Sequence, residues 1–155
     1  MILLIAIMKS ILYCILFIVL SSCVMAPFVN SDVQLRKTPN MMFYVIGSPR
    51  YGINYMIADR IIENYYKAEV VDIKQNIPVQ SGRPNENTLR QYIVSHEYRM
   101  ESTTDSWKLT INIYTYNPRG VDELVVEATS VGNFTTRELV NAAIDNIFKK
   151  IDGRM

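Results

Sequence analysis

One histidine and two cysteines are the residues of this 155-residue sequence best suited to nucleophilic or metal-assisted chemistry. Without a second histidine, a Ser-His-Asp or Cys-His arrangement must use His96 or go without a base. The alternation around His96 places it on the core face of a strand, where we expect a hydrogen-bonded histidine, together with Tyr92, Val94, Tyr98 and Met100. No HExxH, CxxC or acidic calcium loop occurs. We therefore expect no enzymatic activity, no metal site and no cofactor.

Two other residue spacings are similar to those of functional sites but lack residues or surroundings that such sites need. Gly47 and Gly52 are five residues apart after an apolar stretch, as in a phosphate-binding loop, but isoleucine and asparagine replace the required Lys and Ser/Thr. Glu97 and Glu101 fall on the mixed face of an expected strand, which favours solvated carboxylates over an acid/base pair. Neither pattern predicts a catalytic site.

The stretch from Met8 to Cys23, MKSILYCILFIVLSSC, has the organisation of an export signal. Lys9 supplies the positive start, Ile11 to Leu20 is an apolar run, and Leu-Ser-Ser-Cys follows as a small-residue cleavage site. The run is shorter than the roughly 20 residues of a bilayer span. The stretch resembles a bacterial lipoprotein signal peptide with its lipobox, which implies cleavage after residue 22 and lipidation of Cys23, including palmitate.

Lipidation of Cys23 has consequences for redox chemistry and location. Cys14 is discarded with the signal, so the mature chain has no cysteine pair for a disulfide. The established sorting rule retains proteins with aspartate after the lipidated cysteine in the inner membrane. Val24 in that place implies an outer-membrane lipoprotein, lipid-anchored and facing the periplasm. The alternative is an uncleaved N-terminal helix, and translation can start at Met1 or Met8.

The mature part is a single neutral domain by length and charge. It has about 130 residues, enough for one core. Removing the signal takes away one of the 16 basic residues and none of the 15 acidic residues. A neutral chain without a basic stripe is not expected to bind nucleic acid.

The expected organisation is a signal at 1–22, a lipidated segment at 23–40 and a periplasmic α/β domain at 41–152. Residues 24–40 contain Pro27 and Pro39 and lack periodicity, so they suit a tether of up to about 55 Å at roughly 3.3 Å per residue. The alternative is that part of this segment adds an edge strand to the domain.

The domain should begin with a strand, a helix and a second strand. Met41 to Ile46 is a short apolar run, typical of a strand buried on both faces. Asn54 can cap a helix that runs to about Lys67, with an inward stripe that includes Tyr65. A strand at 68–73 and a long loop at 74–87 follow.

Three longer strands and a last helix complete the domain. The alternation at 88–101, 107–116 and 123–131 predicts an antiparallel meander with one apolar face. Leu124 is expected on that apolar face. Thr135 and Glu138 form a capping box before a helix with a clear apolar stripe.

These elements predict an α+β sandwich: a β-α-β unit, a three-stranded meander and a helix, with two helices packed on one face of a mixed, mainly antiparallel sheet. This order resembles envelope lipoproteins related to the N-terminal domain of TolB, including lipopolysaccharide-assembly and curli-secretion lipoproteins. That resemblance covers residues 41–151 and implies a non-enzymatic accessory or assembly subunit of an envelope secretion or export complex, with protein partners and a possible homo-oligomer.

The sheet face opposite the helices is the expected partner surface. Tyrosine and arginine are enriched at interface anchors, and with the loop at 74–87 the candidates on this face are Arg99, Lys108, Asn112, Tyr114, Tyr116, Glu127 and Thr129. The alternative function is a carrier of a lipid or other small apolar ligand between helices and sheet, lined by Met41, Met42, Met56 and Met100. A hydrolase is a third possibility.

Overall fold

The computed structural model describes residues 26–47, 52–80 and 88–154 of the chain. The signal segment and the predicted lipidation site Cys23 lie outside these ranges, as does part of the predicted loop at 74–87. Across the described ranges, no helix is both long enough and apolar enough to cross a membrane.

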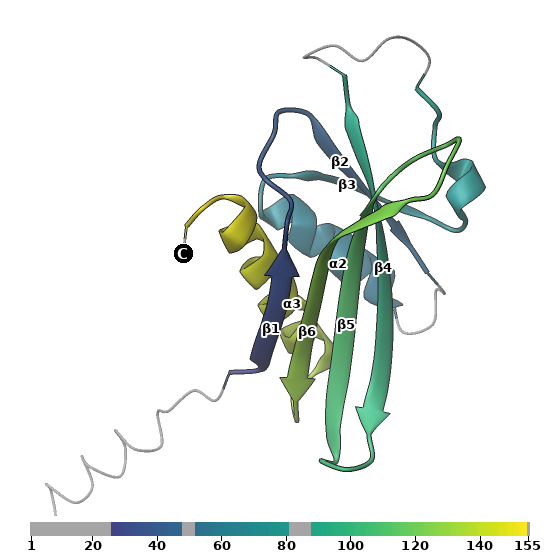
Figure 1. Cartoon of the computed structure of the whole chain (residues 1–155). Helices are drawn as coiled ribbons and strands as arrows, with labels where there is room; N and C mark the ends of the chain where they lie inside the picture. Colours follow the sequence, from purple (N-terminus) through teal and green to yellow (C-terminus); the bar gives the residue numbers. More distant parts are fainter. Residues whose placement is uncertain (1–25, 48–51, 81–87, 155) are drawn as a thin grey trace, which may run out of the picture.

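The described residues form a six-stranded sheet and two α-helices (Figure 1). In chain order the elements are β1 (Phe28–Val33), β2 (Met41–Ile46), α2 (Ile53–Glu63), β3 (Lys67–Val71), the short 3₁₀ helix η2 (Lys74–Asn76), β4 (Arg90–Glu101), β5 (Ser106–Thr115), β6 (Glu123–Gly132) and α3 (Thr136–Ile151).

The strand order in the sheet is β1-β6-β5-β4-β2-β3. The pairs β1–β6, β6–β5 and β5–β4 are antiparallel, whereas β4–β2 and β2–β3 are parallel. The parallel pair β2–β3 needs a crossover, which α2 supplies. The α+β architecture predicted from the sequence, a mixed and mainly antiparallel sheet, is therefore confirmed.

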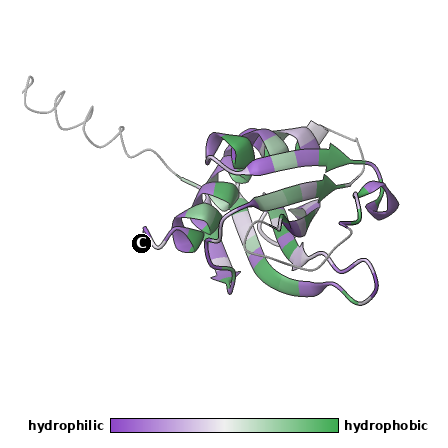
Figure 2. Ribbon diagram, turned by 90° about the horizontal axis from the view of Figure 1, so that it is seen from above, coloured by the Kyte–Doolittle hydropathy of each residue, from purple (hydrophilic) through white to green (hydrophobic). Residues whose placement is uncertain are grey.

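The core lies between the sheet and the helices. Phe43 of β2 and Phe148 of α3 are both fully buried and meet edge to face, with ring centroids 5.5 Å apart. Alternating hydrophobic and hydrophilic segments along the strands are visible in Figure 2, because the face that meets the helices is apolar. Each such side chain contributes roughly 1.5–3 kcal/mol on burial.

Helix α3 forms as the sequence predicts. The Thr135 hydroxyl accepts a hydrogen bond from the Glu138 backbone N–H at 3.3 Å, and the Glu138 carboxylate accepts one from the Thr135 N–H at 2.8 Å. This reciprocal capping box satisfies two donors of the first turn. The buried stripe comprises Leu139, Val140, Ala143, Ile144, Ile147, Phe148 and Ile151.

Helix α2 differs from its prediction at both ends. Gly52, with φ +63°, is the N-cap, whereas Asn54 is buried and donates from Nδ2 to the Gly47 carbonyl at 2.8 Å. The helix ends at Glu63 because the backbone at Tyr65 is left-handed (φ +66°), which turns the chain into β3. Tyr65 is therefore 96% exposed, and the predictions of an Asn54 cap and an inward Tyr65 are wrong.

A charged pair joins the two helices. The Arg60 guanidinium donates from Nε and Nη2 to the two carboxylate oxygens of Asp145, at 2.8 and 2.5 Å. The hydrogen bonds to Asp145 and then to Glu63 raise the pKa of Arg60. A two-point contact of this kind fixes orientation as well as distance, so it sets how α2 lies against α3.

Part of the segment before residue 41 belongs to the sheet. The sequence is compatible with either a tether or an edge strand at residues 24–40. In the structure, Phe28–Val33 form the edge strand β1, which pairs with β6. Helix α3 holds this strand, since Lys150 Nζ donates to the Ser31 carbonyl and Ser31 Oγ to Asn146 Oδ1, both at 2.5 Å. Only four residues therefore separate Cys23 from the first strand.

A β-bulge changes the facing of one predicted core residue. The register between β5 and β6 pairs Ile113 with Val126 but Tyr114 with Leu124, which leaves Val125 as the extra residue. Beyond a bulge the alternation inverts. Leu124 is therefore 42% exposed and Val125 packs against the core, so the prediction of an inward Leu124 is wrong.

Candidate interaction surface

The seven predicted partner-face residues are contributed by β4, β5, the residue after β5, and β6. On β5 the side chains of Leu109, Ile111 and Ile113 are fully buried against the helix layer. The residues between them must point to the opposite face, because successive side chains of a strand alternate. The cross-strand register puts these neighbours on the same face: Arg99 beside Lys108, Asn112 beside Glu127, and Thr110 beside Thr129.

The same face is partly covered by the chain itself. Residues Tyr44, Val71, Ile77 and Ile93 form a second buried cluster there, separate from the main core. Tyr114 and Tyr116 are half-buried against it. The prediction that this face is open along its whole length is therefore wrong at the end near η2, because Ile77 folds back onto the sheet.

A salt bridge fastens this covering segment. Lys74 of η2 lies 2.5 Å from the Asp122 carboxylate, and its ammonium is 5.7 Å from the centroid of the Tyr116 ring. Partial burial would raise the pKa of Asp122, but hydrogen bonds from Lys74 and from the Asn117 N–H outweigh it, and the pKa is lowered. The two tyrosines are thus engaged in packing within the chain.

The opposite half of the face carries exposed charges. Arg99 lies 3.4 Å from Glu97, and Lys108 lies 3.3 Å from Glu101. The first pair is exposed and the second is half-exposed. Pairs of this kind contribute at most about 1 kcal/mol, so a partner can rearrange them at little cost. This half of the face is the more accessible part of the predicted partner surface.

A row of hydrogen-bond acceptors crosses the middle of the face. The register places Ser95, Asn112, Glu127 and Asp32 side by side across β4, β5, β6 and β1. Asn112 Oδ1 is buried and has no hydrogen-bond partner among the described residues. Such an atom is costly to leave unpaired. The exposed carboxylates of Glu127 and Asp32 are the acceptors of this row that donors from outside the chain can reach.

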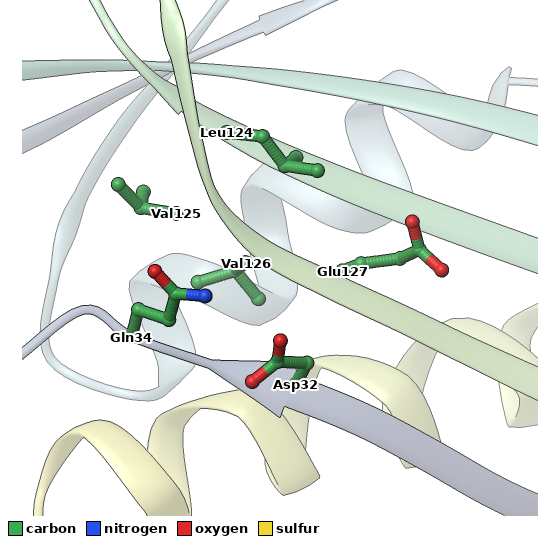
Figure 3. A pocket seen from close by; sticks show the side chains of 6 residues that line it. All are labelled: Asp32, Gln34, Leu124, Val125, Val126 and Glu127. Carbon is green, nitrogen blue, oxygen red and sulfur yellow. The ribbon is translucent and has the colours of Figure 1, made fainter.

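Asp32 and Glu127 also border a shallow cavity of about 170 Å³ (Figure 3). It lies between β1 and β6 beside the bulge, with Gln34, Leu124, Val125 and Val126 as further lining. The sequence prediction did not include Asp32, because β1 was only one of two interpretations. Residues 28–33 read FVNSDV and have no alternation of apolar and polar residues, so the sequence held no clear signal for Asp32.

His96 is placed on the core side of β4, as predicted, but without the expected hydrogen bond. Its Nδ1 has no hydrogen-bond partner among the described residues. The ring lies against Gly47, where an added Cβ would be 2.8 Å from Cε1. Burial lowers the pKa of His96, which favours the neutral imidazole at neutral pH.

The space expected for an apolar ligand is filled by side chains. Between helices and sheet, Ile57, Ile111 and Ile147 are fully buried in one contiguous core. Met41 is part of this core, whereas Met100, on the same face of β4 as Tyr98 but at the end of the strand, is 51% exposed, so its predicted place in a ligand lining is wrong. Cavities of about 260 and 300 Å³ lie instead at strand ends, next to Met100 and next to Leu89 and Tyr116. No group of three histidine, cysteine, aspartate or glutamate side chains suited to a metal ion occurs in the described ranges.

Comparison with known proteins gives structural likenesses at low identity. No protein-family model and no curated protein matches the sequence. A PelC dodecamer from Paraburkholderia phytofirmans is similar at 10% identity and a TM-score of 0.42, over 81% of this chain and 94% of that one. A minor lipoprotein from Acinetobacter baumannii is similar at 7% identity and a TM-score of 0.41, over 74% and 92%. Likenesses this remote carry no argument about function.

Proposed function

We propose that this chain is a lipid-anchored, non-enzymatic accessory subunit of a bacterial envelope complex, held in the outer membrane and facing the periplasm. The observation that carries the proposal is the stretch from Met8 to Cys23, with its positive start, short apolar run and terminal cysteine. Two or more acyl chains on Cys23 would hold the protein at the membrane nearly permanently. Val24 after the cysteine supports the outer membrane as the destination.

The first test is the chemical state of Cys23. Intact mass and membrane fractionation of the native protein are compared with those of a Cys23→Ala variant. We expect acyl chains on the native protein, and a Cys23→Ala variant that is neither lipidated nor found with the outer membrane. An uncleaved, unmodified N-terminus in the native protein would contradict the proposal and leave an inner-membrane helix as the anchor.

We place the partner on the acceptor row in the middle of the sheet face, next to its accessible half. Glu127 is exposed and lies between Asn112 and Asp32, so a partner that brings arginine or lysine would pair with it. Tyr114 is a poorer choice for mutation because it packs on the second cluster.

Charge reversal tests this surface with a matched control. Glu127→Arg should abolish crosslinking of the lipidated protein to its envelope partner, because it puts a cation where the partner's donors are needed. Asp59→Arg reverses an exposed charge on α2 and should leave crosslinking unchanged. Unfolding in urea checks that both variants are folded. Equal crosslinking by the two variants would remove this face from consideration.

A further inference from the structure

The predicted lipid anchor joins the domain at one end of the sheet. Phe28 is the first residue of β1 and follows Cys23 by five residues. Five residues span at most about 18 Å when fully extended. The edge of the domain at Phe28 therefore cannot move further than this from an acyl group on Cys23.

The same end of the sheet carries two exposed apolar side chains, together with two cations that pair with Glu97 and Glu101. Across the sheet, Phe28 pairs with Val131, Val131 with Lys108, and Lys108 with Arg99. Met100 is the next residue after Arg99 in the chain and lies just before the turn between β4 and β5. Phe28 is 73% exposed and Met100 is 51% exposed. In Figure 1 the β4–β5 turn and the start of β1 lie at the same, lower end of the sheet.

We propose that this end of the sheet, the hairpin end, rests on the membrane that holds the anchor, with Phe28 and Met100 in the lipid interface. The inference rests on the proposed function, since it needs the acyl chains on Cys23. Apolar side chains at the headgroup boundary with cations beside them are typical of interfacial contact. Arg99, whose side chain is exposed, can then exchange Glu97 for a lipid phosphate.

The short connection excludes the inverted orientation. Phe28 lies level with Lys108, and the seven residues from there to the end of β5 at Thr115 span roughly 23 Å at 3.3 Å per residue. With the opposite end of the sheet on the membrane, Phe28 would stand farther from the surface than about 18 Å of chain can reach. Val121, 91% exposed in the turn between β5 and β6, therefore points away from the bilayer, and Glu127 in the middle of the sheet face stays free for an envelope partner.

The chain contains its own reporter for this contact. Trp107 is the only tryptophan of the sequence. It pairs with Met100 at the hairpin end, is half-buried, and stacks on Tyr98 with ring centroids 4.8 Å apart. Bromine atoms quench indole emission only at short range, so brominated lipids report whether Trp107 is near the bilayer.

The experiment uses the natively lipidated protein, with acylation of Cys23 first verified by intact mass. It is reconstituted into phosphatidylethanolamine–phosphatidylglycerol vesicles whose acyl chains are either plain or brominated near the headgroup. We expect the emission of Trp107 to fall several-fold in brominated vesicles. The double variant Phe28→Ser and Met100→Ser should recover most of the emission, whereas Tyr65→Ser, an exposed apolar site elsewhere, should not.

A relocated reporter separates this orientation from the others. In the variant Trp107→Phe with Val121→Trp, the indole stands at the opposite end and should keep its emission in brominated vesicles. Quenching of both reporters would mean a domain lying flat, and quenching of neither, on acylated protein, would mean no contact. Either result overturns the orientation while leaving the proposed function intact. Absence of acyl chains on Cys23 overturns both.

Discussion

Asp152 joins three separate segments of the domain at the end of α3. Its carboxylate accepts hydrogen bonds from the Tyr66 hydroxyl at 2.6 Å and from Lys37 Nζ at 2.9 Å, and it also pairs with Arg154. Only 7% of the side chain is exposed. Tyr66 precedes β3 and Lys37 lies between β1 and β2, so this one carboxylate links both edges of the sheet to the last helix.

The stabilising effect of Asp152 follows from its pKa. Burial alone would raise the pKa, but the donors from Tyr66, Lys37 and Arg154 outweigh burial and lower it from 3.8 to about 2. At 1.36 kcal/mol per pH unit, the ionised carboxylate contributes about 2 kcal/mol to the free energy of unfolding. Because the folded-state pKa is lowered, this contribution is present above pH 3.8 and is lost as the pH falls towards 2.

The test is urea unfolding of an Asp152→Asn variant from pH 7 down to pH 2. At pH 7 we expect the variant to be less stable than the natural chain by about 2 kcal/mol, since it lacks the charge that the three donors need. The difference should shrink below pH 4 and vanish near pH 2. Asp59→Asn, at an exposed site on α2, should cost little at any pH. A deficit for Asp152→Asn that stays constant with pH would refute the electrostatic account.

Three further substitutions have expected effects on the free energy of unfolding, measured in urea at pH 7. Phe148→Ala removes a fully buried ring from the centre of the core and should cost about 3–5 kcal/mol; a loss under about 1 kcal/mol would mean that the core refills the space. Thr135→Ala removes the cap of α3 and should cost about 1 kcal/mol, and no loss would mean that water replaces the hydroxyl. Arg60→Ala breaks the half-exposed pair with Asp145 and should cost about 1 kcal/mol. Its effect should become smaller in a background that already carries Asp145→Ala, where only the pair with Glu63 remains, whereas fully additive losses would contradict direct coupling.

Local patterns in the sequence were sufficient where one element decides its own structure. The capping box at Thr135 and the apolar stripe of α3 depend on residues within a few turns of one another, and both are confirmed. The alternation of β5 placed Leu109 and Ile111 correctly, because a strand with one apolar face has only one way to bury it.

Predictions that depended on another part of the chain were less successful. The prediction of an inward Leu124 was wrong because of the bulge at Val125. A bulge is a property of the β5–β6 pair, and it cannot be recognised from the alternation of β6 alone. The prediction of an inward Tyr65 was wrong because the left-handed backbone at Tyr65 ends α2 a turn earlier than predicted. The prediction of an uncovered sheet face was wrong because Ile77, which precedes β4 in the chain, folds onto Ile93 of that strand.

From the sequence alone come the prediction of a lipoprotein signal, the nearly balanced charge, the α+β class and the positions of most helices and strands, because each depends on composition or on a short period. Only the tertiary structure decided that Phe28–Val33 is an edge strand instead of a tether. It also decided which half of the sheet face is accessible and that Asp32 joins the acceptor row. These are contacts between segments distant in the chain, so their partners are known only once the sheet is assembled.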